Sequence, residues 1–245
     1  MADLDLNVGA QIERLVAESL GQTVEIGGVE YATRALHDVR KPEPEPKTID
    51  LSTLRSFAAF VREQTADYAE DRGYFVHVES PTSVRLATGV FGEFNQRVDV
   101  ARVRRVGQSF RFDAWHDPET FLIGVQTLFT DEGQKADVLK LVGNIQWDAN
   151  QTTADDGVTQ IVSTRVGLSF KEKTSTPNPW MLSAHRTFAE VTQPSAPFIL
   201  RTRGGGDKPK QVALFEADGG QWALAAVENV RAWLAGELPD VAVYA

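Results

Sequence analysis

The chain has no cysteine among its 245 residues. This excludes disulfide bonds, thiolate zinc sites, iron–sulfur clusters and a cysteine nucleophile. Histidine is scarce as well. The four histidines are scattered, and none stands three or four residues from another, the spacing of helical metal ligands. We therefore expect no metal, no cofactor and no catalytic residue.

Long hydrophobic runs are also missing. No apolar stretch approaches the roughly 20 residues that a membrane-spanning helix needs. The first six residues are acidic, whereas a signal peptide begins with a basic region and an apolar run. We expect a protein that stays in the cell that makes it and has no membrane partner.

The motifs of common enzyme classes are absent too. The chain contains no Gly-x-Ser-x-Gly nucleophile turn and no P-loop. Its glycine run at 204–206 is followed by Asp-Lys-Pro and a strand-like stretch, so no helix terminus is there to hold a phosphate. The formal net charge of −9 argues against attraction of nucleic acid to the whole surface, although local basic patches stay open.

The first 47 residues have the pattern of an arm. Residues 11–20 have helical periodicity, and residues 24–31 predict a short hairpin around Gly27 and Gly28. Prolines alternate with charged residues over 40–47, which predicts a semi-rigid polyproline strut. We divide the chain into this arm and strut, 1–47, and a body, 48–245.

The body predicts an α+β fold, with a mainly antiparallel sheet, a helical hairpin and a C-terminal helix. Strands come in runs and do not alternate with helices. Helices are expected over 50–71, from Asp117-Pro118 to about 129, over 134–142 and over 221–234. Strands are expected over 74–78, 83–88, 98–106, 145–148, 159–166, 168–173, 198–202 and 212–215, with an edge strand in 238–244.

The second half resembles the YfdQ-like family of phage and prophage proteins, whose function is unknown. The likeness lies in Gly143-Asn-Ile, Asp155-Asp-Gly-Val-Thr-Gln, Pro177-Asn-Pro, His185-Arg-Thr-Phe, Gln193-Pro-Ser-Ala-Pro-Phe and Leu214-Phe-Glu-Ala-Asp-Gly-Gly. It covers roughly residues 50 to 235. The resemblance implies a phage or prophage gene that is expressed in the cytoplasm of a bacterial host. It implies no catalytic residue.

Two groups of residues are candidates for binding. Arg102, Arg104 and Arg105 lie near Phe110, Phe112 and Trp115, and arginines with aromatic side chains on strands can follow a single strand of nucleic acid. A solvated strand face with paired carboxylates is the structural alternative. His185 and Arg186 form a pair between proline bends that could bind a phosphate or carboxylate. A loop-fixing role is the alternative.

Other candidates have ordinary structural explanations. His77 lies inside a predicted strand, and His116 precedes a helix cap. Asp155 and Asp156 are more typical of a turn than of a cation loop. Glu216 and Asp218 stand where carboxylates cap a helix, although paired carboxylates can also do acid–base work.

Three functions follow from these features. The first is a non-catalytic phage protein that associates with copies of itself, or binds a host or phage protein, through the arm. The second is a nucleic-acid accessory protein of phage replication or recombination. The third is an enzyme whose site is formed by dispersed carboxylates together with His185 and Arg186.

Overall fold

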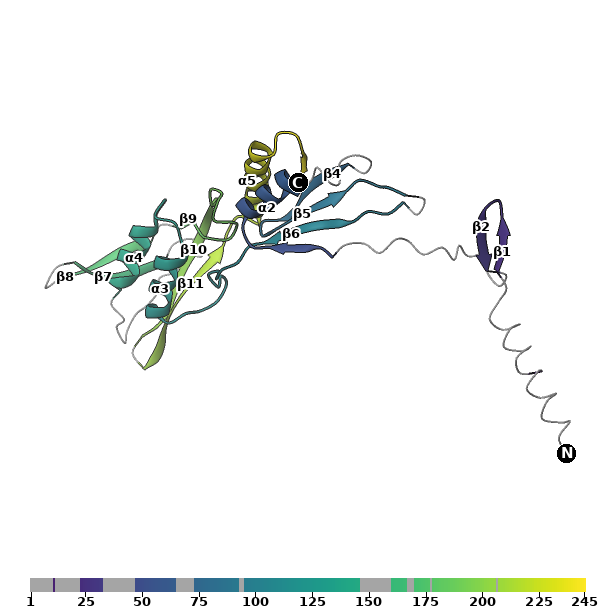
Figure 1. Cartoon of the computed structure of the whole chain (residues 1–245). Coiled ribbons are helices and arrows are strands. Elements are labelled where there is room, and N and C mark those ends of the chain that lie inside the picture. Colours follow the sequence, from purple (N-terminus) through teal and green to yellow (C-terminus); the bar gives the residue numbers. More distant parts are fainter. Residues whose placement is uncertain are drawn as a thin grey trace, which may run out of the picture. The chain divides into compact units, whose positions relative to one another are not determined.

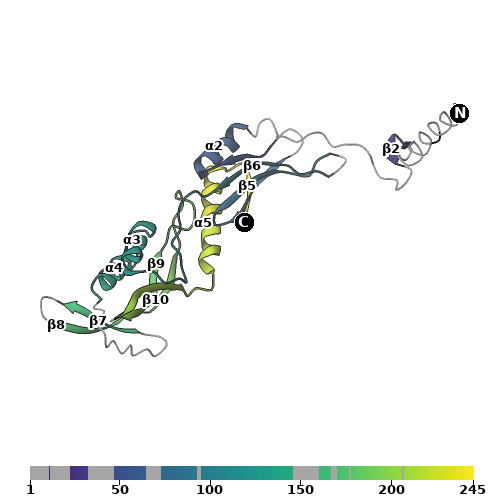
Figure 2. The ribbon, with the colours of Figure 1, turned by 90° about the horizontal axis from the view of Figure 1, so that it is seen from below.

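The structure of the protein is a computed structural model (Figures 1 and 2). It describes residues 11, 23–32, 47–64, 73–92, 95–145, 160–166, 170–176, 178–205 and 207–245. Of residues 32, 64, 160–166, 170–176 and 205 it describes the backbone alone. The chain divides into two units, Met1–Glu45 and Pro46–Ala245. The elements are those of an α+β protein with mostly antiparallel sheets, as predicted.

The first unit contains a two-stranded hairpin. Strands β1 (Thr23–Ile26) and β2 (Val29–Ala32) pair antiparallel. Gly27 and Gly28 have φ angles of 63° and 82°, and a two-residue hairpin turn with two left-handed residues strongly favours glycine there. The predicted hairpin is confirmed. The predicted helix over 11–20 and the strut over 40–47 lie outside the described residues, apart from Gln11 and Lys47.

The second unit begins with a five-stranded sheet in the order β12-β4-β5-β6-β3. Its strands are β3 (Ile49–Leu51), β4 (Tyr74–Ser80), β5 (Ser83–Thr88), β6 (Asp99–Arg104) and β12 (Ala242–Tyr244). The three central strands are antiparallel, while β3 runs parallel to β6 and β12 parallel to β4. The bounds of β5 match the prediction, and β12 occupies the edge that was expected for the C-terminal stretch.

Helix α2 (Leu54–Gln64) begins later than predicted. Asp50, the expected helix start, lies in β3 because Ile49–Leu51 pairs with β6. Thr53 caps the helix, because its Oγ1 accepts a hydrogen bond from the backbone N–H of Ser56 at 3.1 Å. Local patterning alone did not reveal a strand this short.

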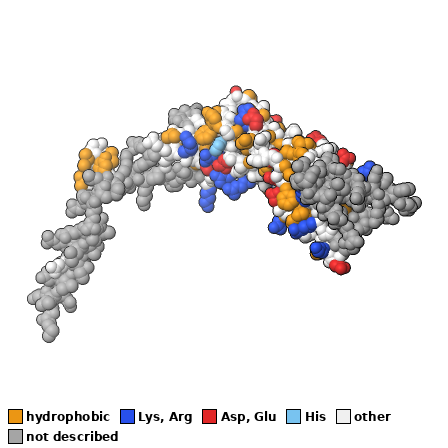
Figure 3. Space-filling view, turned by 180° about the vertical axis from the view of Figure 1, so that it is seen from behind, with side chains coloured by type: hydrophobic (Ala, Val, Ile, Leu, Met, Phe, Trp, Pro, Cys, Tyr) orange, Lys and Arg blue, Asp and Glu red, His pale blue; other side chains and the backbone are white. Residues whose placement is uncertain are grey.

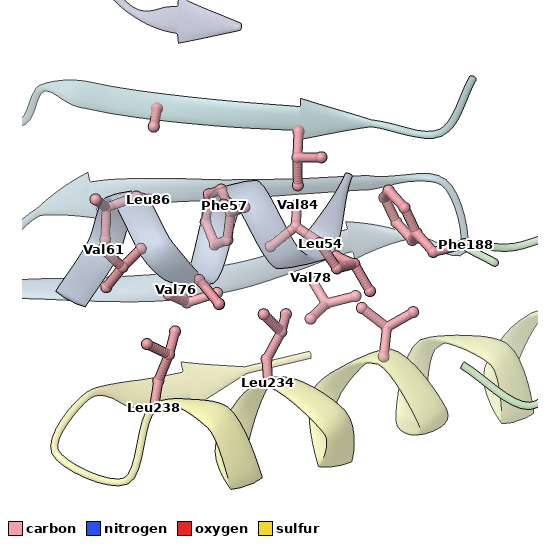
Figure 4. Close-up of a cluster of buried hydrophobic side chains, with 14 of the residues drawn as sticks. Leu54, Phe57, Val61, Val76, Val78, Val84, Leu86, Phe188, Leu234 and Leu238 are labelled. Atoms are coloured by element: carbon pink, nitrogen blue, oxygen red, sulfur yellow. The ribbon is translucent and has the colours of Figure 1, made fainter. Parts of the chain in front are cut away.

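Helix α2 and the last helix, α5 (Gln221–Glu237), pack on one face of this sheet (Figure 4). Alternate strand residues such as Val76, Val78, Val84 and Leu86 point into the same core. Their partners include Leu54, Phe57, Val61, Val230, Leu234 and Leu238 from the helices and their ends. This first core is complete only when α5 and Leu238 are packed against the sheet.

A second core lies under a three-stranded sheet in the order β11-β10-β9. Its strands are β9 (Trp180–Ser183), β10 (Ser195–Gly205) and β11 (Lys208–Glu216). Residues 113–116 run along the free edge of β11, with hydrogen bonds between His116 and Val212 in both directions. Between Arg203 and Gly205 the pairing slips by a bulge. A Cβ at Gly204 would stand 1.8 Å from the carbonyl oxygen of Pro209, so only glycine fits there.

Helices α3 (Pro118–Leu128) and α4 (Lys135–Gly143) cover that second core as the predicted helical hairpin. The side chain of Lys135 fixes their connection. Its Nζ donates to the carbonyl oxygens of Gln126 and Phe129 at 2.9 and 2.8 Å and pairs with Asp131. Strands β7 (Gln160–Val166) and β8 (Phe170–Thr176) form a separate hairpin. The predicted turn at Asp155 and Asp156 lies outside the described residues.

The carboxylate of Asp117 caps α3 as predicted, and this makes the helix sensitive to acid. Its Oδ1 accepts from the N–H of Thr120 at 3.0 Å. A hydrogen bond with the side chain of Thr120, and after it this backbone hydrogen bond, lower the pKa of Asp117 below its ordinary value of 3.8. Because the folded-state pKa is depressed, the stabilisation is present above 3.8 and is lost as pH falls through the lower folded-state value.

We therefore expect Asp117→Asn to remove part of the acid sensitivity while keeping a good cap. Thermal melts by circular dichroism between pH 2 and 7 would measure it. The variant should lose less stability than the parent at the acid end and match it near neutrality. Parallel curves for the two proteins would contradict the role of this carboxylate.

Candidate functional site

The three arginines proposed to contact nucleic acid have different surroundings. Arg102 lies on the open face of the five-stranded sheet, where it and Arg85 each stand against both Glu79 and Asp99. The closest pairs are Arg102 Nη2–Asp99 Oδ2 at 3.0 Å and Arg85 Nη1–Asp99 Oδ1 at 3.2 Å. Two cations and two carboxylates thus neutralise one another, so Arg102 has little charge left for a phosphate.

Arg105 binds backbone instead. Its Nε donates to the carbonyl oxygen of Thr187 at 2.9 Å, and its Nη2 donates to those of His185 and Gln108, each at 2.8 Å. Its Nη1 also reaches Ser109 Oγ at 3.1 Å. A planar guanidinium suits such a set of acceptors because it carries five donors in a fixed fork. Arg105 therefore anchors the loop around residue 186 to the end of β6.

Of the three, Arg104 alone is exposed and without a hydrogen-bond or ion-pair partner in the described part of the chain. The structure therefore does not assemble Arg102, Arg104 and Arg105 into one binding surface. The structural alternative, a strand face with paired carboxylates, describes Arg102. Binding of nucleic acid through these residues stays a prediction that no contact supports.

Arg186 lies in an aromatic box between α5 and the second sheet. Only 6% of it is exposed. Its guanidinium lies 4.0 Å from the ring centre of Trp222, 4.7 Å from Phe112 and 5.2 Å from Phe198, and it pairs with Glu216. Burial lowers the pKa of Arg186, and the negative charges of Glu216 and Asp218 act against that shift. An external anion would have to displace Glu216.

The neighbouring His185 shares no side-chain contact with Arg186 among the described residues. Its backbone N–H donates to the carbonyl oxygen of Leu128 at 2.8 Å. The two members of the predicted anion site therefore do not converge on one point. Anion binding by this pair stays a prediction.

Gln193 ties the loop that carries both residues. Its Oε1 accepts from the backbone N–H groups of Arg186 and Thr187 at 3.0 and 3.1 Å. Its Nε2 donates to the carbonyl oxygens of Phe188 and Val191 at 2.9 and 3.2 Å. Because all four partners are backbone groups of a buried turn, Gln193 substitutes for missing sheet partners. The loop-fixing alternative thus has direct contacts behind it.

The carboxylates proposed for acid–base work are engaged as well. Asp218 caps α5, because its Oδ2 accepts from the N–H of Trp222 at 2.8 Å and its Oδ1 from that of Gly220 at 3.0 Å. Glu216, the other predicted cap, pairs with Arg186 instead. Within the described ranges, no three His, Asp or Glu side chains are placed to hold a metal ion.

The remaining described histidines have structural surroundings. His116 contacts the carbonyl oxygen of Arg111 through Nε2 at 2.8 Å, and its ring lies 5.1 Å from that of Phe110. His77 is half-buried in β4, next to Arg85 in the register of β5. Its Nδ1 is buried and has no hydrogen-bond partner among the described residues. Neither position combines a histidine with a nucleophile.

Comparisons of the chain with protein-family models, with curated proteins and with solved structures gave no match. The site must therefore be assessed from its own geometry.

One exposed feature stands out, on the hairpin of the first unit. Register pairs Val24 with Tyr31 and Ile26 with Val29, so these four apolar side chains share one face. Val24 is 41% exposed and Ile26 57%. The other face carries Glu25 directly opposite Glu30. This ribbon has an apolar face and an acidic face, which is the pattern of a contact element.

A second exposed feature, a pair of outward-facing arginines on β10, was not predicted from the sequence. Arg201 and Arg203 alternate with Leu200 and Thr202, a period of two that places the arginines on the outer face of the strand. The strand was predicted, but its outward residues were not singled out. Arg203 stacks on Trp115 at 4.0 Å. The alternation of arginine with buried residues along the strand is the signal from which the sequence could have predicted this face.

Proposed function

We propose that the protein works by association with protein, first with copies of itself, and that the hairpin of the N-terminal arm is the contact element. A host or phage protein is the other partner class that suits the same element. The setting is that of a phage or prophage protein in a bacterial cytoplasm. No helix among the described residues is long and apolar enough to cross a membrane.

The hairpin face of Val24, Ile26, Val29 and Tyr31 carries this proposal. An isolated two-stranded hairpin is at best marginally stable in water. Two further features of the hairpin favour a contact. An exposed apolar face gains stability when it is buried, at roughly 25 cal/mol per Å². The like charges of Glu25 and Glu30 stand directly opposite and cost stability in the free hairpin.

The test is the mass of the full chain in solution, measured by light scattering over a range of concentrations. We expect a defined multimer for the parent. Ile26→Glu should shift it to the monomer, because the contact would bury an unpaired charge. Thr23→Glu adds the same charge on the opposite face of the hairpin and should leave the mass unchanged.

Removal of residues 1–47 should have the same effect as Ile26→Glu. A parent that is monomeric at every concentration would refute self-association and leave a different protein as the partner. A multimer that survives both Ile26→Glu and the deletion would place the contact on the body.

A further inference from the structure

The outer face of the sheet β9–β10–β11 is the face turned away from α3 and α4. Side chains alternate between the two faces along a strand. Phe198, Leu200 and Leu214 belong to the buried core under the helices. Arg203 and Phe215 occupy the alternate positions of β10 and β11, so they lie on the outer face.

An arginine–tryptophan stack spans this face. Trp115 lies in the segment that bonds to one edge of β11, and Arg203 lies on β10, which bonds to the other edge. The guanidinium carbon of Arg203 is 4.0 Å from the ring centre of Trp115. The Trp115 ring also meets Phe215 edge to face at 5.9 Å. The contact of Arg203 with Trp115 therefore crosses β11 and, together with Phe215, forms a platform on the outer face.

Arg203 is held in position but keeps donors free. Its Nε donates to Gln211 Oε1 at 2.8 Å. Apart from this bond and the stack on Trp115, it has no partner in the described part of the chain, and it is exposed. Its terminal nitrogens therefore have no acceptor among the described residues and are left for a ligand. A pre-oriented guanidinium is suited to a phosphate oxygen and to a stacked base.

Further positive charge lies at the end of the same hairpin. Lys208 and Lys210 are exposed, and Asp207 in the same turn offsets one of these charges. In the half of the body at the right of Figure 3, Lys and Arg side chains border a hydrophobic area. A local excess of cations stands out in a chain with a net charge of −9.

We propose that this platform, made of Trp115, Arg203, Lys208 and Phe215, binds single-stranded nucleic acid. Proteins that bind single strands without sequence preference combine cations along the backbone with aromatic or guanidinium planes on which bases stack. DNA and RNA share this chemistry. The binding surface is distinct from the hairpin of the arm and does not depend on association of the chain.

The experiment measures fluorescence anisotropy of labelled 20-nucleotide probes with the full chain at low salt. The probes are oligothymidylate DNA, oligouridylate RNA and a DNA duplex of the same length. We expect both single strands to bind more tightly than the duplex. The tighter of the two identifies the preferred sugar. The logarithm of affinity should fall with the logarithm of salt by about 0.7 per phosphate contact.

Variants separate this platform from the arginines of β6. Arg203→Gln should weaken binding about tenfold, since stacking on one base contributes about that much. Arg203→Lys should lose nearly as much, because an ammonium keeps the charge but has no plane. Lys208→Gln should lower the salt slope by about 0.7, one phosphate contact. Arg104 is an exposed arginine outside the platform, so Arg104→Gln should leave the affinity for single strands unchanged.

Three results would overturn the proposal. One is no binding of either single strand at low salt. Another is loss of binding in Arg104→Gln with none in Arg203→Gln. The third is polyglutamate competing as well as the oligonucleotide at equal charge, which would show an acidic protein segment to be the ligand. The outcome is independent of the mass measurement, so failure here leaves the proposed association intact.

Discussion

Replacing Arg186 by methionine is expected to lower the free energy of unfolding by about 3 kcal/mol. Removing one partner of a buried ion pair leaves the other charge without compensation, at a cost of roughly 3–5 kcal/mol. We take the lower end because the Glu216 side chain is 30% exposed and water can partly solvate it. Urea unfolding at a single protein concentration would measure the loss.

A double variant identifies the cause. Arg186→Met combined with Glu216→Gln removes both charges and should recover most of the loss, since replacing a buried pair by uncharged groups is often neutral. Arg186→Lys should stay destabilised, because an ammonium cannot lie flat against Trp222 and Phe112. If Arg186→Met were as stable as the parent, the aromatic box would have no structural role.

Leu234→Ala is expected to destabilise the protein by about 2–5 kcal/mol. The side chain of Leu234 is 0% exposed and lies in the first core between α5 and the sheet (Figure 4). Truncation would remove buried methyl groups and leave a cavity that the neighbouring side chains only partly fill. The same unfolding experiment would measure this change.

Leu224 provides a matched control on the same helix. It is 74% exposed, so the same substitution removes little buried surface. Leu224→Ala should stay within about 0.5 kcal/mol of the parent. Equal losses for the two leucines would mean that helix propensity, and not burial, governs the stability of α5.

The elements that the sequence predicted well carry their signals locally. Asp117 and Pro118 begin α3 because a capping carboxylate and an N-terminal proline act within one turn. Strand β5 has a clear β-branched and apolar pattern within its own bounds. By contrast, β3 and β9 were missed because, unlike the hairpin strands β1 and β2, they have no glycine turn beside them to mark them. β3 is stabilised by β6, which lies far along the chain, and β9 by the next strand, β10, across a loop.

The candidate site was harder to predict for a related reason. Arg105 bonds to the carbonyl oxygen of His185, 80 residues away, and Arg186 pairs with Glu216, 30 residues away. Sequence proximity grouped Arg105 with Arg102 and Arg186 with His185. The fold instead gives the members of each pair different partners, because Arg105 lies just beyond the end of β6 and Arg186 lies in the aromatic box. Residue type indicated charge but could not indicate which carbonyl or carboxylate would neutralise it.

The order of elements along the chain sets the order in which the body can be completed during synthesis. The first sheet is begun by β3 to β6, yet its core needs Val230 and Leu234 of α5, and its edge needs β12. The second sheet and its helices are made in between. A nascent chain that has released only β3 to β6 also carries α2, so the part of the apolar sheet face that α2 does not cover stays exposed until the residues of α5 emerge. Such a face invites aggregation or a chaperone during that interval.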